Sequence, residues 1–179
     1  MKTKENFRRI YILGSMGGGK TTLAKIISKK LNLPDYDLDN IFWKRKYDLK
    51  RGDKECKKLL DKIIKKDKWI IEGVYSRWVK SGVKRSQLVV WLDLPFKTIA
   101  YRLIKRKILR EDGKYMENWR DTWRMVKQNY QYTQIKHNDS DKKDTYGYKL
   151  YKDHKSLLNK HKFVHIKNKK ERNKFLEDI

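Results

Sequence analysis

The sequence has very little cysteine and no long apolar run. Cys56 is the only cysteine among 179 residues, so an internal disulfide is excluded and a reducing compartment is expected. The run "IYIL" near the basic N-terminus is too short for the hydrophobic part of a secretory signal, and no stretch is long enough to span a bilayer. We therefore expect a soluble, cytoplasmic protein, a monomer or homodimer, with no membrane partner.

Acidic residues are scarce relative to basic ones. The chain carries 47 Lys and Arg against 22 Asp and Glu, a formal net charge of +25, which favours polyanions or phosphorylated small molecules as partners. The excess is spread along the chain and is not gathered in a tail or a single basic segment. A lysine-rich solvated surface explains this distribution as well as a nucleic-acid partner does, so both alternatives stay open.

Apolar runs alternate with helical patterns along the chain. Strands are expected at "RRIYILG", "PDYDLD", "KWIIEG", "QLVVWLDL" and "KFVHIK", with helical patterns between them. This alternation predicts an α/β fold with a parallel sheet covered by helices on both faces. Because there are no repeats and no linker, and 38% of the residues are hydrophobic, a single domain over residues 1–179 is predicted.

The segment "GSMGGGKTT" lies between the first predicted strand and the first predicted helix. It matches the pattern G-x-x-x-x-G-K-[ST], which in this context indicates a P-loop that binds nucleotide phosphates. The phosphates must approach backbone N–H groups closely, and side chains would block that approach. The residues expected to bind the nucleotide are Gly14, Ser15, Gly17, Gly18, Gly19, Lys20, Thr21 and Thr22.

Two residues at the end of this segment have expected chemical roles. Lys20 can reach the β- and γ-phosphates and neutralise charge on a transferring phosphoryl group, and the Thr21 hydroxyl can hold Mg²⁺. The amide groups at the start of the following helix face the anion, and the helix dipole favours its binding. A nucleotide with Mg²⁺ is the expected ligand.

The P-loop alone does not distinguish a kinase from a GTPase or a motor ATPase. The run "LVVWLD" ends in Asp93, as a Walker B strand does, which makes Asp93 a candidate metal ligand beside Thr21. Leu94 follows where many ATPases have a glutamate that polarises water. The segment "NKKE" at 168–171 resembles the guanine-reading N-K-x-D only weakly, and no D-x-x-G accompanies it, so a loop and a helix start are expected there.

Acids after the second strand and a row of arginines favour phosphoryl transfer to a small acceptor. Asp37 or Asp39 would reach the crevice at the carboxyl edge of the sheet, where it could orient an acceptor or hold a Mg²⁺-bound water, although capping of a helix is the alternative. Arg102, Arg106 and Arg110 are spaced by four residues. Their guanidinium groups suit a transferring phosphoryl group, and a solvated basic face is the alternative.

These motifs together resemble a known family. The segments "GSMGGGKTTLAKIISKKLNLPDYDLDNIFW", "WIIEGVYSRW", "LVVWLDLPFKTIAYRLIKR" and "FVHIKNKKERNKFL" are similar to adenylate-kinase-like P-loop proteins, in the branch that carries the name DNA topology modulation protein. The wider relatives of that branch are nucleoside monophosphate, shikimate and gluconate kinases. The resemblance covers nearly the whole chain and is weakest between Lys114 and Lys160.

The resemblance implies a five-stranded parallel sheet with the P-loop strand in the centre, ATP with Mg²⁺ as the donor, and a lid after the fourth strand at about residues 107–140. It implies that Asp39, Glu72 and Arg77 bind the acceptor, although relatives commonly have Asp at the position of Glu72. It also implies that Arg102 and Arg106 lie at the base of the lid. The residues expected to act in catalysis are Lys20, Asp39, Arg102 and Arg106.

Other candidate residues have simpler explanations. Trp119, Trp123 and Tyr130 could stack on bases, but their spacing with Met116 and Val126 is that of one helix face, so core packing is predicted. The segment from Trp43 to Lys54 mixes aromatic and basic residues and could contact the acceptor. The four histidines show no metal-binding spacing, so no structural metal is expected.

The leading hypothesis from the sequence is an ATP- and Mg²⁺-dependent kinase of a small molecule, most simply a nucleoside or nucleotide. One alternative is a nucleic-acid-associated P-loop protein, either a polynucleotide kinase or an ATP-gated binder, which the net charge of +25 favours. Another alternative is an ATP-binding protein without turnover. A topoisomerase is not predicted, because nothing resembles a tyrosine nucleophile with its supporting groups.

Overall fold

Strands and helices alternate along the part of the chain that the computed structural model describes, residues 7–45, 48–109, 118–134, 145–158 and 163–179. The strands are β1 (Arg9–Gly14), β2 (Asp35–Asp37), β3 (Trp43–Arg45), β4 (Leu49–Lys50), β5 (Trp69–Gly73), β6 (Leu88–Leu92) and β7 (Phe163–Ile166). The helices are α1 (Lys20–Leu31), α2 (Leu38–Phe42), α3 (Asp53–Ile64), α4 (Lys80–Arg85), α5 (Phe96–Leu109), α6 (Trp119–Gln134), α7 (Tyr146–Leu158) and α8 (Lys169–Asp178).

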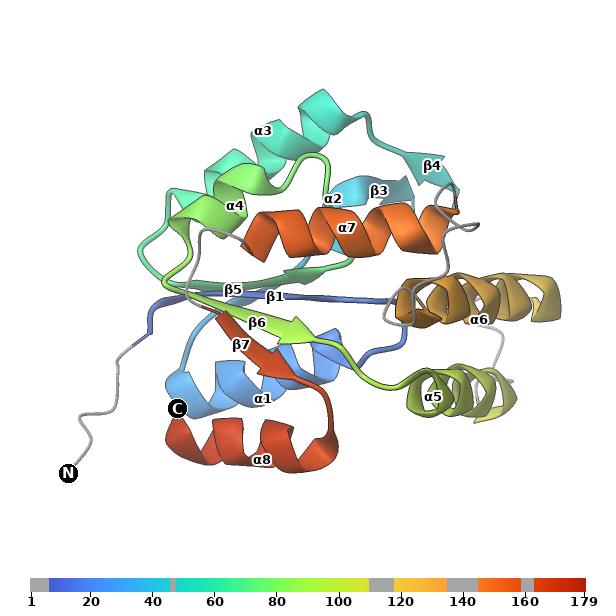
Figure 1. Ribbon diagram of the computed structural model, residues 1–179. Helices are drawn as coiled ribbons and strands as arrows, with labels where there is room; N and C mark the ends of the chain where they lie inside the picture. Colours follow the sequence, from blue (N-terminus) through green and yellow to red (C-terminus); the bar gives the residue numbers. More distant parts are fainter. Residues whose placement is uncertain (1–6, 46–47, 110–117, 135–144, 159–162) are drawn as a thin grey trace.

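A five-stranded parallel sheet organises the fold (Figure 1). Its strand order is β2-β5-β1-β6-β7, so the P-loop strand β1 is central and pairs with β5 on one side and β6 on the other. The predicted α/β fold and the central place of the P-loop strand are confirmed. Both strands beside β1 come later in the chain, so the strand order reverses at β1. At such a reversal the connections run to opposite sides of the sheet and leave a crevice at the carboxyl end of the strand.

The two faces of the sheet bury separate apolar cores. On one face Tyr11 and Leu13 pack with buried residues of α3, α4 and α7, and on the other Ile10 and Ile12 pack with α1 and α8 (Figure 1). Both sets are fully buried. Successive side chains of a strand point to opposite faces of the sheet, and helices cover both faces here. The central strand must therefore be apolar at every position, as "IYIL" is.

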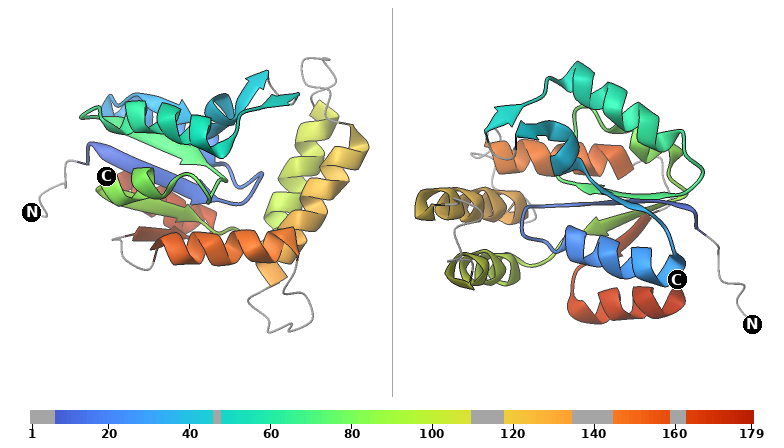
Figure 2. Two further views of the ribbon diagram at one scale, coloured as in Figure 1. Left: turned by 90° about the horizontal axis from the view of Figure 1, so that it is seen from above. Right: turned by 180° about the vertical axis from the view of Figure 1, so that it is seen from behind.

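Helices α5 and α6 lie beyond the carboxyl ends of the strands (Figure 2). They pack against each other around Ile99, Leu103 and Val126, and we call them the α5–α6 hairpin. The lid predicted at 107–140 falls partly outside the described residues, as does Arg110. The prediction of one domain over residues 1–179 stays a prediction. No helix in the described segments combines the length and the apolar character needed to cross a bilayer.

The prediction that three aromatic residues of α6 pack in the core is wrong. Trp119, Trp123 and Tyr130 are 48%, 57% and 41% exposed. Helix α6 instead buries a neighbouring stripe, which consists of Thr122, Val126, Asn129, Tyr132 and Thr133. Two of these polar side chains bond to the preceding turn: the Asn129 amide donates to the carbonyl of Met125, and the Thr133 hydroxyl donates to that of Asn129. These bonds reduce the cost of burying polar groups, so the less apolar stripe can face the protein.

Helix α2 and strands β3 and β4 were not predicted from the sequence. Helix α2 follows β2 directly, because the Asp37 carboxylate accepts a hydrogen bond from the backbone N–H of Asp39 at 2.8 Å and caps the helix. Strands β3 and β4 form a small antiparallel hairpin. The Arg51 guanidinium fixes the start of this hairpin, since it donates to the carbonyls of Ile41 and Trp43 at 2.8 Å each.

Candidate active site

The P-loop joins β1 to α1 in a backbone shape that requires glycine. Gly17 and Gly19 have φ values of +74° and +91°, which side-chain-bearing residues rarely adopt. A Cβ atom at Gly17 would lie 2.8 Å from Cδ2 of Leu103, and one at Gly19 would lie 3.1 Å from Nη1 of Arg102. The glycines therefore allow both the turn itself and the close approach of α5 to it.

Lys20 begins α1 and is buried at the base of the P-loop. Its side chain is 8% exposed, and Nζ donates a hydrogen bond to the carbonyl of Ser15 at 3.0 Å. An ammonium group has three donors, so this bond holds the side chain across the loop while other N–H groups stay available. The Ser15 hydroxyl is buried without a hydrogen-bond partner among the described residues, which fits a loop shaped to receive a polar ligand.

Thr21 and Glu72 meet beside Lys20. The Thr21 hydroxyl donates to Oε1 of Glu72 at 2.6 Å. Burial raises the pKa of the Glu72 carboxyl, while the charge of Lys20 and the bond from Thr21 act in the opposite direction. Glu72 was predicted to bind the acceptor, and the structure places it next to the hydroxyl expected to hold Mg²⁺. A hydroxyl and a carboxylate are hard oxygen ligands, so this pair fits Mg²⁺.

Asp37 and Asp39 stand on the other side of Glu72. Asp37 is the register neighbour of Glu72 across β2 and β5, and both aspartates raise the pKa of the Glu72 carboxyl. The Asp39 carboxylate accepts a hydrogen bond from the Tyr75 hydroxyl at 2.7 Å. The carboxyl ends of β2 and β5 therefore bring Asp37, Asp39, Glu72 and Tyr75 to one edge of the sheet, next to the P-loop.

Asp93 lies at the end of β6, in different surroundings from Thr21. Its Oδ2 atom is 2.9 Å from Nε2 of His165 on the neighbouring strand β7. Burial, and to a lesser extent the charge of Asp93, raise the pKa of Tyr132 on α6 and of Tyr151 on α7. The Thr21 hydroxyl therefore bonds to Glu72, whereas Oδ2 of Asp93 contacts His165.

A pocket of about 460 Å³ extends from the P-loop between α5 and α8. Arg102 donates to the carbonyl of Gly18 at 3.0 Å, and Arg106 contacts the sulfur of Met125 at 3.7 Å. Burial, and then the charge of Arg172, lower the pKa of Arg102. The polar and charged residues that line the pocket are Lys20, Thr21, Thr22, Arg102, Arg106, Asn168, Lys169 and Arg172.

The α8 residues of this pocket were not identified as site residues from the sequence. "NKKE" forms a loop and a helix start, as predicted: the Asn168 side chain accepts from the backbone N–H of Glu171 at 2.9 Å, and Glu171 reaches back to the N–H of Lys167. This capping box begins α8 at the carboxyl end of β7. In the sequence, the position of this capping box at the end of a predicted strand, with Arg172 one residue after it, is the pattern that could have identified these residues as part of the site.

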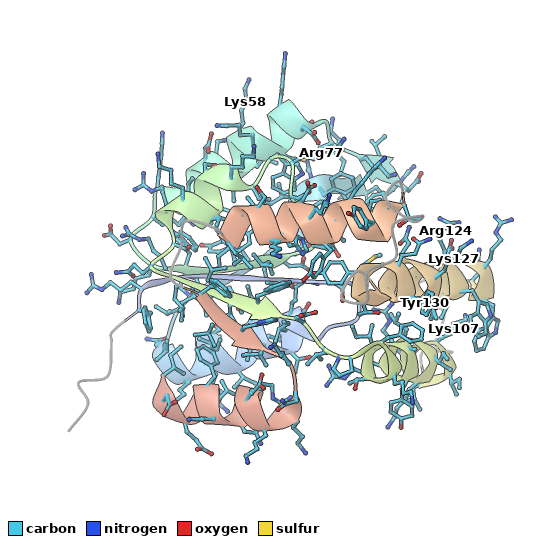
Figure 3. All side chains as sticks on the ribbon, viewed as in Figure 1. Lys58, Arg77, Lys107, Arg124, Lys127 and Tyr130 are labelled. Carbon is cyan, nitrogen blue, oxygen red and sulfur yellow. The ribbon has the colours of Figure 1, made fainter. Side chains whose placement is uncertain are left out.

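Arg77 lies away from the P-loop, on the loop after β5 (Figure 3). It is exposed and pairs with Asp53 of α3, with 3.4 Å between Nη2 and Oδ1. Its charge lowers the pKa of Tyr146 at the start of α7, although burial of that hydroxyl raises the pKa more strongly. Asp39, Tyr75, Tyr146 and Arg77 thus form a sequence of polar groups leading outward from the P-loop.

A buried hydrogen-bond network supports the loop that carries Tyr75. Nε2 of His154 is 2.9 Å from the carbonyl of Val74, so this nitrogen carries the proton and donates. Nδ1 then accepts from the Tyr132 hydroxyl at 3.0 Å, and the hydroxyl oxygen accepts from the Trp91 indole at 3.1 Å. Burial lowers the pKa of His154 to about 4. The network joins α6, α7 and β6 to the loop after β5.

The chain is similar in sequence to known proteins. The chain is 36% identical to the uncharacterized protein YqaC of Bacillus subtilis over 104 residues, and this alignment covers 58% of this chain and 58% of that protein. It is 43% identical to the shikimate kinase of Azobacteroides pseudotrichonymphae over 119 residues, and this alignment covers 58% of this chain and 69% of that protein. The chain therefore spans little more than half the length of the first of these relatives.

Solved structures of small-molecule kinases share the fold. The shikimate kinase of Bacteroides thetaiotaomicron superposes with a TM-score of 0.60 at 16% identity, over 96% of this chain and 95% of that one. A gluconokinase of Sinorhizobium meliloti gives a TM-score of 0.53 at 9% identity, over 96% and 88%. Residues 10–121 match the AAA domain family. Since that match covers more than half of the sequence, the chain belongs to the AAA domain family, as a P-loop protein similar to small-molecule kinases.

Proposed function

We propose that this protein transfers a phosphoryl group from ATP to a small-molecule acceptor. The observation that carries the proposal is the convergence of Lys20, Thr21, Glu72 and Asp39 at one point of the sheet edge, between a nucleotide-sized pocket and a row of polar groups. The relatives and structural neighbours named shikimate kinase, gluconokinase and dephospho-CoA kinase support phosphoryl transfer as the reaction class.

On the donor side, Lys20 would neutralise the phosphates, with the P-loop amides around them. Arg102 and Arg106 would contact the same anion from α5, because they line the pocket from the opposite wall. Mg²⁺ bound there would offset the negative charge of the phosphates. We propose that Thr21 and Glu72 hold the Mg²⁺ ion, directly or through water. Asp93 is a less suitable ligand, because its carboxylate contacts His165.

On the acceptor side, Asp39 would orient the attacking group. Its carboxylate is already fixed by the Tyr75 hydroxyl, so it has a defined direction before any substrate arrives. Arg77 would meet the outer end of the acceptor after releasing its exposed pair with Asp53, a bond that contributes little stability at such exposure. A nucleoside or nucleotide remains the proposed acceptor class, and assignment to the branch named DNA topology modulation protein remains a prediction.

The decisive experiment is a coupled assay of ADP release over a panel of nucleosides, nucleoside monophosphates, shikimate, gluconate and dephospho-CoA. We expect one acceptor class to stimulate ADP release and Lys20→Ala to abolish the stimulation. Lys25→Ala, which removes an exposed lysine from the same helix, is the matched control and should leave the rate unchanged. Tight ATP binding without stimulation by any acceptor would favour a binding protein and contradict the proposal.

A further inference from the structure

The α5–α6 hairpin carries an exposed surface outside the pocket that extends from the P-loop. One side of the hairpin holds Arg102, Leu103 and Arg106, which line the nucleotide pocket. The exposed residues of α6 that the structure describes lie elsewhere, and all are aromatic or basic. They are Trp119, Arg120, Trp123, Arg124, Lys127 and Tyr130. We call these six residues the α6 stripe.

Two of the three rings of the α6 stripe contact a side chain of α5 although they are exposed. Tyr130 packs edge-on against Phe96 of α5, with 5.3 Å between ring centroids. The ammonium of Lys107 lies 6.0 Å from the Trp119 ring. Trp119 and Trp123 are four residues apart, which places them about 6 Å apart along one side of the helix. Large apolar side chains gathered on an exposed face are typical of an interaction site.

The charge around these rings is mainly positive. Helix α5 contains no acidic residue in its 14-residue span, and the acid in the first turn of α6 is Asp121, which pairs with Arg124 at 2.9 Å. Arg120 and Lys127 therefore add positive charge beside the rings, and Figure 3 shows Lys107, Arg124, Lys127 and Tyr130 together on the hairpin. A partner with both flat rings and negative charge fits this surface.

We propose that the α6 stripe binds single-stranded nucleic acid, with Trp119 and Trp123 stacking on bases and Arg120 and Lys127 contacting phosphates. Every base has a π-face, so such stacking does not require a particular sequence. An acidic peptide fits less well, because the negative faces of aromatic rings do not attract carboxylates. An anionic membrane also fits less well, because a helix lying in a membrane surface presents a continuous apolar face, and basic side chains interrupt the exposed face of α6.

The test is fluorescence anisotropy of labelled oligothymidylate with the full chain over a salt series. Trp123→Ala should weaken binding between about 5-fold and about 150-fold, the range for loss of one aromatic stack. Arg120→Ala combined with Lys127→Ala should lower the slope of log K against log salt by about 1.4, because each single-strand phosphate contact contributes about 0.7. ATP binding should be unchanged in both variants, which shows that the nucleotide pocket is intact.

Matched controls separate this site from a diffuse basic surface. Lys58→Ala combined with Lys62→Ala removes the same charge from exposed positions on α3, far from the hairpin in Figure 3, and should leave oligothymidylate binding unchanged. Equal weakening by both double variants, or no effect of Trp123→Ala, would overturn the proposal. So would absence of oligothymidylate binding, competition by polyglutamate as strong as that by unlabelled oligothymidylate, or binding to phosphatidylserine vesicles alone. Trp123→Leu keeps an apolar side chain and should weaken oligothymidylate binding as Trp123→Ala does.

Discussion

The P-loop crevice and the outer face of the α5–α6 hairpin both carry positive charge, but they hold it differently. In the crevice Lys20 is buried and bonded to the P-loop, and Thr21 is bonded to Glu72. On the hairpin Lys127 and Arg120 are exposed. A charge fixed in a low-dielectric site acts more strongly than one in water, so substitutions in the crevice should have large effects and those on the hairpin small effects on stability and catalysis.

Lys20→Ala should give the largest effect. Loss of a group that stabilises charge in the transition state lowers kcat by about 10²-fold to 10³-fold, and no other described lysine lines the base of the P-loop in the same way. The measurement is the acceptor-stimulated rate of ADP release, with thermal unfolding as a check that the protein is folded. A Lys20→Ala enzyme with the normal rate would show that the crevice does not hold its charge for catalysis.

The second prediction concerns a buried residue, His154, and the pH dependence of the free energy of unfolding. The native pKa is about 4 and the unfolded value is about 6.5, so the unfolded chain binds a proton first on acidification. The free energy of unfolding should therefore fall as pH decreases from about 6.5 to about 4, by roughly 3 kcal/mol from this group. Urea unfolding at several pH values measures the slope.

The matched variant for this prediction is His154→Gln. Its amide can still donate to the carbonyl of Val74 and accept from Tyr132, but it does not titrate, so the slope between pH 6.5 and 4 should become shallower. Equal slopes for the two proteins would mean that His154 is not the group responsible.

Glu72→Gln should raise the Mg²⁺ concentration needed for half-maximal activity by about 10-fold to 100-fold, the range for loss of a group that supports a metal site. Asp93→Asn is the comparison, because Asp93 contacts His165 instead of Thr21. If Asp93→Asn raised this Mg²⁺ concentration more than Glu72→Gln does, the result would contradict the proposed role of Glu72 and favour Asp93, the metal ligand predicted from the sequence.

The smallest effects should separate the two stripes of α6. Val126→Ala removes two methyl groups from a buried position and should lower the free energy of unfolding by about 2 kcal/mol. Trp123→Ala should change it by less than about 0.5 kcal/mol, because the side chain is 57% exposed. Urea unfolding of both variants checks this, and a large loss for Trp123→Ala would show that the ring is buried after all.

The sequence predicted those parts of the molecule whose signals are local. The P-loop is a contiguous motif, and the glycines of "GSMGGGKTT" are required by the turn in which they lie. The central strand was predicted because an apolar run covered on both faces leaves little choice of element. The capping box at Asn168 and Glu171 is also local, since its bonds join residues three apart.

The sequence therefore determined, by itself, the fold class, the P-loop turn and the set of acids at the strand ends. Only the tertiary structure decided that Glu72 meets Thr21, that Asp93 meets His165, and which stripe of α6 is buried. The reason is physical: helical periodicity defines stripes but does not say which one faces the protein, and a carboxylate acquires its partner only when distant strands come together in register. Trp119, Trp123 and Tyr130 were placed in the core because their spacing defines one stripe, whereas packing against α5 and α7 selects the stripe that contains Thr122, Asn129 and Tyr132.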